Sequence, residues 1–393
     1  MKKIMYLICN VSHGKGGHFY SLRTTVEAFQ DVVCEPIVVN IGIQPSPVLE
    51  ESKVSNYYIH FNGYNFFSVF SELNTLIKKH TPNAIHSFDI PSYFFGRGLS
   101  LKFKLPLVLT KCGGKNLKYT PYVQNFILYS KENLDYLQKQ KKYNNTNFYL
   151  IPNRVNKIIL DNKRIDNLKL DYNIDSGAIK LLRISRFVKA YEESIIQSIN
   201  LLKTFKKVGI NSQLLLIGEI QDEKIFRRIK QYCKGENNIL FITDSKYTLN
   251  ASALIGVADC VIGTGRGIME AASMQKVLYT PLESKQMPIL IDENNFQQLL
   301  STNFSPRNKI KNIITKNTIK KEVNIVRDSK ERELYMRFTD NIYKNYFDIS
   351  STINLYTKIY NNIIYKNDTK YIDIFLHLLF TSRSLYNSNK SYK

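Results

Sequence analysis

Two glycine-rich segments stand in the same setting, each directly after a strand-like apolar run and directly before a helix-like stretch. They are HGKGGH at 13–18 and GTGRG at 263–267. Glycine lets the backbone approach a phosphate closely, and a helix N-terminus adds unpaired N–H groups and a positive dipole. A tight turn without a ligand is the alternative for either segment alone, but one in each half of the chain predicts a shared phosphate site. The residues expected at the phosphates are Gly16, Gly17, Gly265, Arg266 and Gly267.

Two cations and one carboxylate accompany the second glycine segment. Arg186 and Lys189 follow the apolar run LLRIS, where they suit a pyrophosphate whose charge grows as a sugar leaves it. Glu270 lies three residues into the following helix-like stretch, where its carboxylate can accept hydrogen bonds from both hydroxyls of a ribose. The alternatives are a solvated loop for the two cations and, for Glu270, an acid stabilised by the helix dipole. Arg183 is expected inside the strand, as a pairing residue.

Short apolar runs alternate with longer helix-like stretches for most of the chain, which is typical of parallel βαβ units. One set runs from KKIMYLICN to YLIPN, and a second begins at IKLLRIS after a polar connector. We therefore predict an α/β fold: a Rossmann-like domain at 1–160, a second at 161–325 facing it across a cleft, and a helical segment at 326–393.

The charge of the chain narrows the kinds of partner. Lys and Arg number 55 against 33 Asp and Glu, a formal net charge of +22. Such a chain can bind nucleic acid, anionic lipid headgroups or phosphorylated substrates. Nucleic acid is the least favoured because the sequence has no RNP-like aromatic motif, zinc-finger pattern or block of consecutive basic residues.

Cysteine usage and hydropathy indicate the compartment. The five cysteines are scattered and form no CxxC pair, which argues for a reducing environment and against a disulfide framework or a zinc site. The opening run is expected to be a strand and not a signal peptide, and no run approaches the ~18–20 apolar residues of a spanning helix. We expect a cytoplasmic protein.

Several segments together resemble the retaining glycosyltransferases of family 4, which have the GT-B fold. In the second half these are IPNRVN, LLRISRFVK, QLLLIGE and ADCVIGTGRGIMEAASMQKV, and in the first half GKGGHFYSL, AIHSFD and LTKCGG. The resemblance covers roughly residues 1–320. It implies that the second domain binds most of the donor, that the first binds the acceptor, and that the final helices cross back to the first domain.

The resemblance also implies roles for single residues. Glu270 matches the second Glu of the family's E-x7-E motif, which would bind the donor ribose, and Arg186 matches the phosphate-binding Arg. The backbone of 265–267 would cradle the pyrophosphate, and Gly16 and Gly17 match the first-domain loop that touches the donor phosphates. In the stretch HSFD, which matches the family's HxHD, His86 and Asp89 are the polar candidates for a catalytic role. The alternative for His86 is a buried histidine at a strand end that only satisfies backbone groups.

Three positions depart from the family pattern. Ile262 stands at the first Glu of E-x7-E, Tyr191 stands at the family's phosphate-binding Lys, and Phe88 stands at the second His of HxHD. Lys189 is the candidate to replace that Lys. These departures leave the fold prediction intact, but they put the donor sugar and the role of each residue in question.

The combined prediction is an enzyme: a metal-independent, hexosyltransferase-like, retaining glycosyltransferase of cell-envelope polysaccharide synthesis. It would move a sugar from a nucleotide-sugar donor to a glycan or lipid-linked acceptor. No DxD sequence occurs, so we expect no metal and no cofactor beyond the donor substrate. The alternatives are a nucleotide-sugar 2-epimerase of GT-B type and a non-catalytic glycan-binding protein.

A membrane-facing surface is expected in the first half. Phe66, Phe67, Phe70 and Leu73 share one face of a predicted helix that ends in the basic stretch KKH, and aromatic and basic residues follow at 93–104. Such a surface could seat the enzyme peripherally on the anionic inner face of the plasma membrane. The alternative is an ordinary helix whose apolar face packs on the core.

Overall fold

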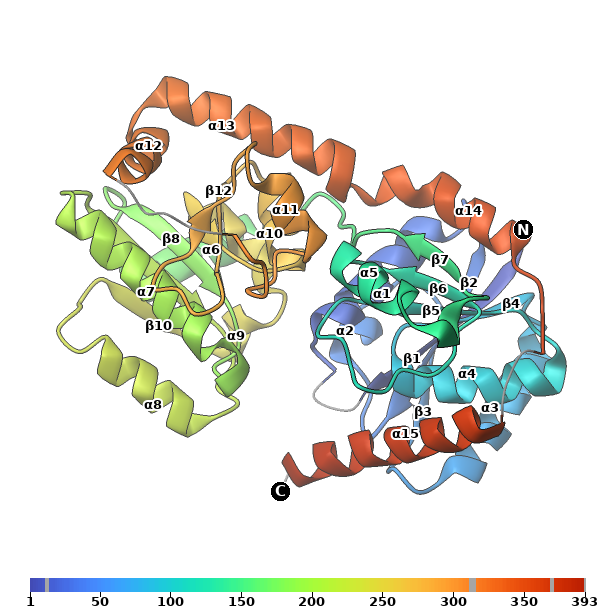
Figure 1. Cartoon of the computed structure of the whole chain (residues 1–393). Helices are drawn as coiled ribbons and strands as arrows, with labels where there is room; N and C mark the ends of the chain where they lie inside the picture. The colour runs from blue at the N-terminus through green and yellow to red at the C-terminus, as the bar shows by residue number, and fades with distance from the viewer. Residues whose placement is uncertain (11–13, 311–315, 368–370, 392–393) are drawn as a thin grey trace. The chain divides into compact units, whose positions relative to one another are not determined.

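The computed structural model describes residues 1–10, 14–310, 316–367 and 371–391, with side chains except within 316–320 and 384–391. His13, the first residue of the first glycine segment, lies outside this range. The chain divides into two compact units, drawn with their elements in Figure 1. The first unit comprises Met1–Arg154 and Ile349–Lys393, and the second comprises Val155–Asp348.

The first unit is built on a seven-stranded, fully parallel sheet of order β3-β2-β1-β4-β5-β6-β7. Its strands are β1 (Lys3–Asn10), β2 (Glu35–Gly42), β3 (Asn56–His60), β4 (Ala84–Ser87), β5 (Leu107–Lys111), β6 (Asn125–Leu128) and β7 (Asn147–Leu150). Its helices are α1 (Gly17–Phe29), α2 (Pro47–Glu50), α3 (Phe66–His80), α4 (Ile90–Phe103), α5 (Lys131–Gln138), α14 (Ile353–Asn362) and α15 (Tyr371–Ser391), with short turns η1 (Lys141–Tyr143) and η5 (Ile349–Thr352). The central strand β1 is buried from Ile4 onward, which explains its continuous apolar run.

The second unit has a six-stranded sheet of order β10-β9-β8-β11-β12-β13, parallel except for the last strand. Its strands are β8 (Ile179–Ile184), β9 (Ser212–Ile217), β10 (Ile239–Ile242), β11 (Cys260–Ile262), β12 (Val277–Thr280) and β13 (Ile289–Leu290). Its helices are α6 (Asn162–Asp171), α7 (Glu192–Lys207), α8 (Glu223–Tyr232), α9 (Ser245–Thr248), α10 (Arg266–Ser273), α11 (Phe296–Ser301), α12 (Lys316–Arg327) and α13 (Ser329–Ile342), with turns η2 (Lys189–Tyr191), η3 (Ala251–Val257) and η4 (Tyr343–Phe347).

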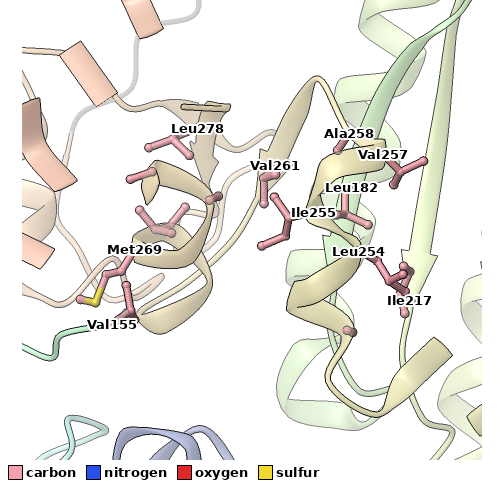
Figure 2. Close-up of a cluster of buried hydrophobic side chains, with 14 of the residues drawn as sticks. Val155, Leu182, Ile217, Leu254, Ile255, Val257, Ala258, Val261, Met269 and Leu278 are labelled. Carbon is pink, nitrogen blue, oxygen red and sulfur yellow. The ribbon is translucent and has the colours of Figure 1, made fainter. Parts of the chain in front are cut away.

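One face of the second sheet carries a packed apolar layer that holds β8, β11 and α10 together (Figure 2). Leu182, Val261 and Leu278 occupy paired positions on three neighbouring strands, so their side chains project from the same face. Met269 of α10 belongs to the same buried cluster. This layer positions the segments that follow β8 and β11, where the predicted donor residues lie.

The helices after residue 320 divide between the two units. In the second unit, the Tyr335 hydroxyl of α13 donates to the carbonyl of Ile291 at 2.7 Å. In the first unit, the hydroxyl of Tyr360 in α14 bonds to that of Tyr6 in β1 at 2.8 Å. The junctions at 154/155 and 348/349 differ from the predicted boundaries at 160/161 and 325/326, because α13 packs into the second unit's core. Within the described residues, no helix has both the length and the apolar character needed to cross a bilayer.

Candidate functional site

In both sheets the strand order reverses at one point, between β1 and β4 in the first unit and between β8 and β11 in the second. Ligands of open α/β sheets bind at such a reversal, beyond the carboxyl ends of the strands. In the second unit, β8 and β11 are directly paired through Leu181 and Cys260. The segment after β8, with Arg186, and the turn after β11, with Gly265, therefore start from the same edge of one sheet.

The turn after β11 leads directly into α10. Gly265 adopts a φ of +49°, a conformation that favours glycine, and it is the residue that caps α10. Its N–H donates to the carbonyl of Asn303 at 3.1 Å, and the N–H of Gly267 donates to the carbonyl of Thr264 at 3.1 Å. The N–H groups of both glycines are thus engaged inside the chain, and the pyrophosphate cradle expected at 265–267 stays a prediction.

Glu270 lies one helical turn after Arg266, and the two side chains meet. Arg266 Nε donates to Glu270 Oε1 at 2.6 Å, and Glu270 is only 8% exposed. Burial raises the pKa of this carboxyl, and the positive charge and hydrogen bond of Arg266 act in the opposite direction. An ionised carboxylate has about four acceptor positions, so the bond from Arg266 leaves capacity for the hydroxyl donors of a ribose.

Arg183 is a buried cation that ties three elements together. It lies in β8, as predicted, and is 2% exposed. One terminal nitrogen donates to the carbonyl of Ile262 at the end of β11 (3.1 Å), and the other donates to Ser194 Oγ in α7 (2.9 Å). Burial lowers the pKa of its guanidinium to about 10. These bonds hold the ends of β8 and β11 beside the start of α7.

Arg186 follows β8 and is partly exposed. Its terminal nitrogens donate to Gln221 Oε1 and to the Tyr191 hydroxyl, each at 3.3 Å, and its guanidinium carbon lies 5.5 Å from the centre of the Tyr191 ring. Neutral groups therefore orient this cation, and no carboxylate in the described ranges of the chain lies within ion-pair distance of it. The Tyr191 hydroxyl and ring therefore help to hold Arg186 in place.

Lys189 occupies a different environment from Arg186. Its side chain is 75% exposed, and its ammonium pairs with Glu192 at 2.8 Å. The same carboxylate also pairs with Arg228 at 3.0 Å. Lys189 thus belongs to a surface ion-pair network with Glu192, whereas Arg186 is held by the neutral groups of Tyr191 and Gln221.

Gly218, which the sequence reasoning did not single out, packs directly beneath the Arg186 segment. It follows β9, and a Cβ atom on it would lie 1.9 Å from the carbonyl oxygen of Ser185. Only glycine fits there unless the backbone moves. A glycine directly after the buried strand of QLLLIGE was the signal available in the sequence, because such a residue often marks a close approach of two backbones.

In the first unit, Gly16 and Gly17 stand at the start of α1. Gly16 is the residue before the helix and Gly17 is its first residue. A Cβ atom on Gly17 would meet nothing within 4 Å, so there is open space beside its backbone. Gly14 has a φ of +67°, and its carbonyl accepts a 2.6 Å hydrogen bond from Ser46 Oγ. This bond anchors the described part of the turn to the segment after β2.

Asp89 lies at the strand-order reversal of the first sheet and is partly exposed. Its carboxylate accepts from the N–H of Cys9 at the end of β1 and from the N–H of Ser92 in α4, both at 2.7 Å. Burial raises its pKa to about 6, and these hydrogen bonds act in the opposite direction. Asp89 therefore caps α4 and links it to β1 at the edge where a ligand of this unit would bind.

His86 lies inside the first unit, away from any surface. It has no exposed area, and its ring nitrogens bond to the hydroxyls of Tyr360 and Thr110, both at 2.7 Å. Burial lowers its pKa to about 3. This is the environment of a core histidine and differs from the catalytic role predicted for His86. We do not retain it as a catalytic candidate, because a substrate could reach neither nitrogen.

The sequence matches no protein-family model and no curated protein. Solved structures resemble it throughout its length, at low identity. A glycosyltransferase from Rickettsia africae has a TM-score of 0.65 and 15% identity, covering 92% of this chain and 98% of its own. Anabaena HepE in complex with UDP and glucose has a TM-score of 0.66 and 13% identity, covering 92% and 100%. A putative UDP-N-acetylglucosamine 2-epimerase from Listeria monocytogenes has a TM-score of 0.55 and 14% identity, covering 94% and 99%.

Similarity at these identities shows the fold alone. The chain has the two α/β domains and the helical C-terminal segment of these structures, which confirms that part of the fold prediction, and the arrangement of the two domains across a cleft stays a prediction. In the described part of the chain, no three side chains of His, Cys, Asp or Glu are grouped to hold a metal ion.

Proposed function

We propose that the chain is a retaining, family-4-type glycosyltransferase of cell-envelope polysaccharide synthesis. It would transfer a hexose-like sugar from a nucleotide-sugar donor to a glycan or lipid-linked acceptor. The observation that carries this proposal is the edge of the second sheet, where Arg186, held by the neutral groups of Gln221 and Tyr191, follows β8, and the Gly265 turn and the buried Glu270 follow β11. The similar structures add support, since one is described as a glycosyltransferase and another holds UDP and glucose.

In the proposed reaction the bond between the anomeric carbon and the diphosphate breaks. The acceptor hydroxyl forms its bond to that carbon on the same face, and its proton passes to the departing diphosphate. Arg186 and Arg266 would stabilise the charge that develops on the diphosphate without a metal ion. Glu270 would accept hydrogen bonds from the donor ribose. We propose the first unit, with Asp89 at its strand ends, as the acceptor side.

Binding of nucleoside diphosphates tests this proposal without knowledge of the acceptor. UDP, GDP and CDP are each added to the full chain, and the thermal unfolding midpoint is measured. At a hundredfold excess over its Kd, a ligand of the native state stabilises it by about 2.7 kcal/mol. We expect one of the three nucleoside diphosphates to raise the unfolding midpoint, and we expect the substitution Glu270→Ala to abolish most of that increase. No shift with any of the three would overturn the proposal.

Product analysis separates the alternatives. Slow release of nucleoside diphosphate from the donor without acceptor is expected of a transferase. Formation of the C2-epimer of the donor would instead identify the nucleotide-sugar 2-epimerase, and binding without turnover would identify a non-catalytic binding protein. The epimerase remains the second candidate because a putative enzyme of that class has a similar fold.

We further propose that the enzyme works in the cytoplasm, peripherally at the inner face of the plasma membrane, and binds no nucleic acid. A lipid-linked acceptor would be presented at that surface, and the net charge of +22 favours contact with anionic headgroups. All five cysteines are free thiols in the structure, which is compatible with a reducing compartment.

A further inference from the structure

The membrane-facing helix predicted from the sequence, α3, directs most of its apolar stripe inward. Leu73 is fully buried, and Phe66 and Phe70 pack against the rings of Phe94 and Phe95 of α4. The exception is Phe67, which is 93% exposed. The core-packing alternative therefore describes α3, and the exposed apolar surface of the first unit lies elsewhere.

Helix α15 carries that exposed surface. Its residues at spacings of three and four share one face of the helix. They are Ile372 (69% exposed), Phe375 (58%), Leu376 (43%) and Leu379 (51%). Arg383, also exposed, falls on the same face by helical spacing. We call these five residues the α15 outer face.

The opposite face of α15 is fixed to the first unit by buried polar contacts. The carboxylate of Asp373 pairs with Arg97 of α4 at 2.7 Å and with Lys142 at 2.8 Å, and it accepts the N–H of Tyr122 at 2.9 Å. His377 bonds to the carbonyl of Ile90 at 2.8 Å. These contacts set the rotation of the helix. They also turn the only acid of the described helix inward, so the α15 outer face carries no negative charge.

Further apolar and basic groups adjoin this face. A cavity of about 480 Å³ lies between α15 and the segment before α3, and its lining includes Tyr64, Phe66, Leu379 and Arg383. Tyr64 is itself 75% exposed. At the other end of the face, Tyr119 donates to the carbonyl of Asp373 at 2.9 Å, and its neighbour Lys118 is exposed. Arg383 thus adjoins the aliphatic and aromatic side chains of this face, and Lys118 is a further exposed cation of the same unit.

We propose that the α15 outer face, together with Tyr64 and Phe67, docks on the surface of an anionic lipid bilayer, with α15 lying in the plane of the interface. Apolar side chains flanked by cations bind such membranes by inserting below the headgroups and pairing with them. A second copy of this chain is a poorer occupant, because it would bring a second basic and acid-free face against Arg383. The inference does not depend on the transferase reaction.

The absence of tryptophan from the sequence allows a direct test, because one introduced tryptophan reports on its own position. Phe375→Trp places the probe on the α15 outer face, and Leu170→Trp places it on α6 of the second unit, where Leu170 is 75% exposed. Each variant is mixed with vesicles of phosphatidylglycerol and phosphatidylcholine, and with vesicles of phosphatidylcholine alone. For Phe375→Trp we expect a blue-shifted emission that brominated lipid quenches, with anionic vesicles only and reversed by high salt. Leu170→Trp should show neither change.

A loss-of-binding variant gives the second measurement. Replacing Ile372 and Phe375 by serine should weaken partition into anionic vesicles at least about tenfold, because two large apolar groups no longer insert. The matched control replaces Leu170 and Leu334, both exposed in the second unit, by serine and should bind as the wild type does. Both variants should keep the wild-type response to nucleoside diphosphate, which shows that the fold and the donor site are intact.

Three results would overturn the proposal. The first is equal quenching of both tryptophan probes, and the second is vesicle binding that the serine substitutions on α15 leave unchanged. The third is a wild-type dimer in solution, measured by light scattering, that those same substitutions dissociate, because a second copy would then occupy the face. None of these results bears on the proposed transferase reaction, which the nucleotide titration tests separately.

Discussion

Replacing Arg186 by alanine is expected to lower turnover strongly while leaving the protein folded. The two hydrogen bonds of its guanidinium, to Gln221 and to Tyr191, are both long at 3.3 Å and involve neutral partners. At this length and partial exposure each bond contributes about 0.5 kcal/mol, the low end of the usual range, so the midpoint of unfolding should fall by only a few degrees. In the proposed reaction the same guanidinium faces a diphosphate whose charge grows as the sugar leaves.

The size of the expected loss of turnover follows from the negative charge that develops on the diphosphate in the transition state. Removing one preorganised donor to a developing negative charge costs roughly 2–4 kcal/mol of transition-state stabilisation. This corresponds to a loss of roughly 30- to 900-fold in kcat. The Kd of the nucleoside diphosphate should rise by less, because the contact strengthens as the leaving group forms.

The assay is release of nucleoside diphosphate from the nucleotide-sugar donor, with Kd measured by calorimetry on the same preparations. Lys189→Ala is the matched control, since it removes a cation three residues away that is exposed and paired with Glu192. We expect it to change kcat less than about threefold, the range of a surface ion pair. Wild-type turnover in Arg186→Ala would refute the role of Arg186. A large loss of turnover in Lys189→Ala would show that Lys189 stabilises the departing diphosphate instead.

Three further substitutions test other parts of the account. Glu270→Ala should weaken donor binding by about 2–4 kcal/mol, since two ribose hydrogen bonds are lost, and unchanged affinity in calorimetry would exclude the ribose role. Gly218→Ala should reduce both kcat and the unfolding midpoint, because the new Cβ atom, 1.9 Å from the carbonyl oxygen of Ser185, must displace the segment that carries Arg186; a wild-type midpoint would contradict this. Asp373→Ala should cost about 3–5 kcal/mol in urea unfolding, because Arg97 is left buried without its partner, and a cost below 1 kcal/mol would show that this ion pair does not hold α15 in place.

The strands of the two sheets were predictable because each has a signal in its own local sequence. A strand buried on both faces needs a continuous apolar run, and Lys3–Asn10 and Ser212–Ile217 have one. The glycine turn before α10 was predictable for a similar reason, since Gly265 must adopt a positive φ in the short turn between β11 and α10. Local sequence also placed Arg183 within β8.

The partners of single side chains were not predictable, because they come from distant parts of the chain. Tyr360, which occupies one nitrogen of His86, lies 274 residues away, and Asp373 lies 276 residues from Arg97. The sequence correctly predicted that one face of α3 is apolar. Periodicity alone cannot say whether such a stripe meets water, lipid or another helix, and here Phe94 of α4 covers part of it.

The central claim, a nucleoside diphosphate bound at the β8–β11 edge of the second sheet, is tested most directly by a crystal structure with the diphosphate that the thermal screen selects. The account predicts phosphate oxygens within hydrogen-bonding distance of the Arg186 guanidinium, and ribose hydroxyls on the Glu270 carboxylate. A well-ordered diphosphate that contacts neither residue, bound for example at the β1–β4 edge of the first unit alone, would contradict it.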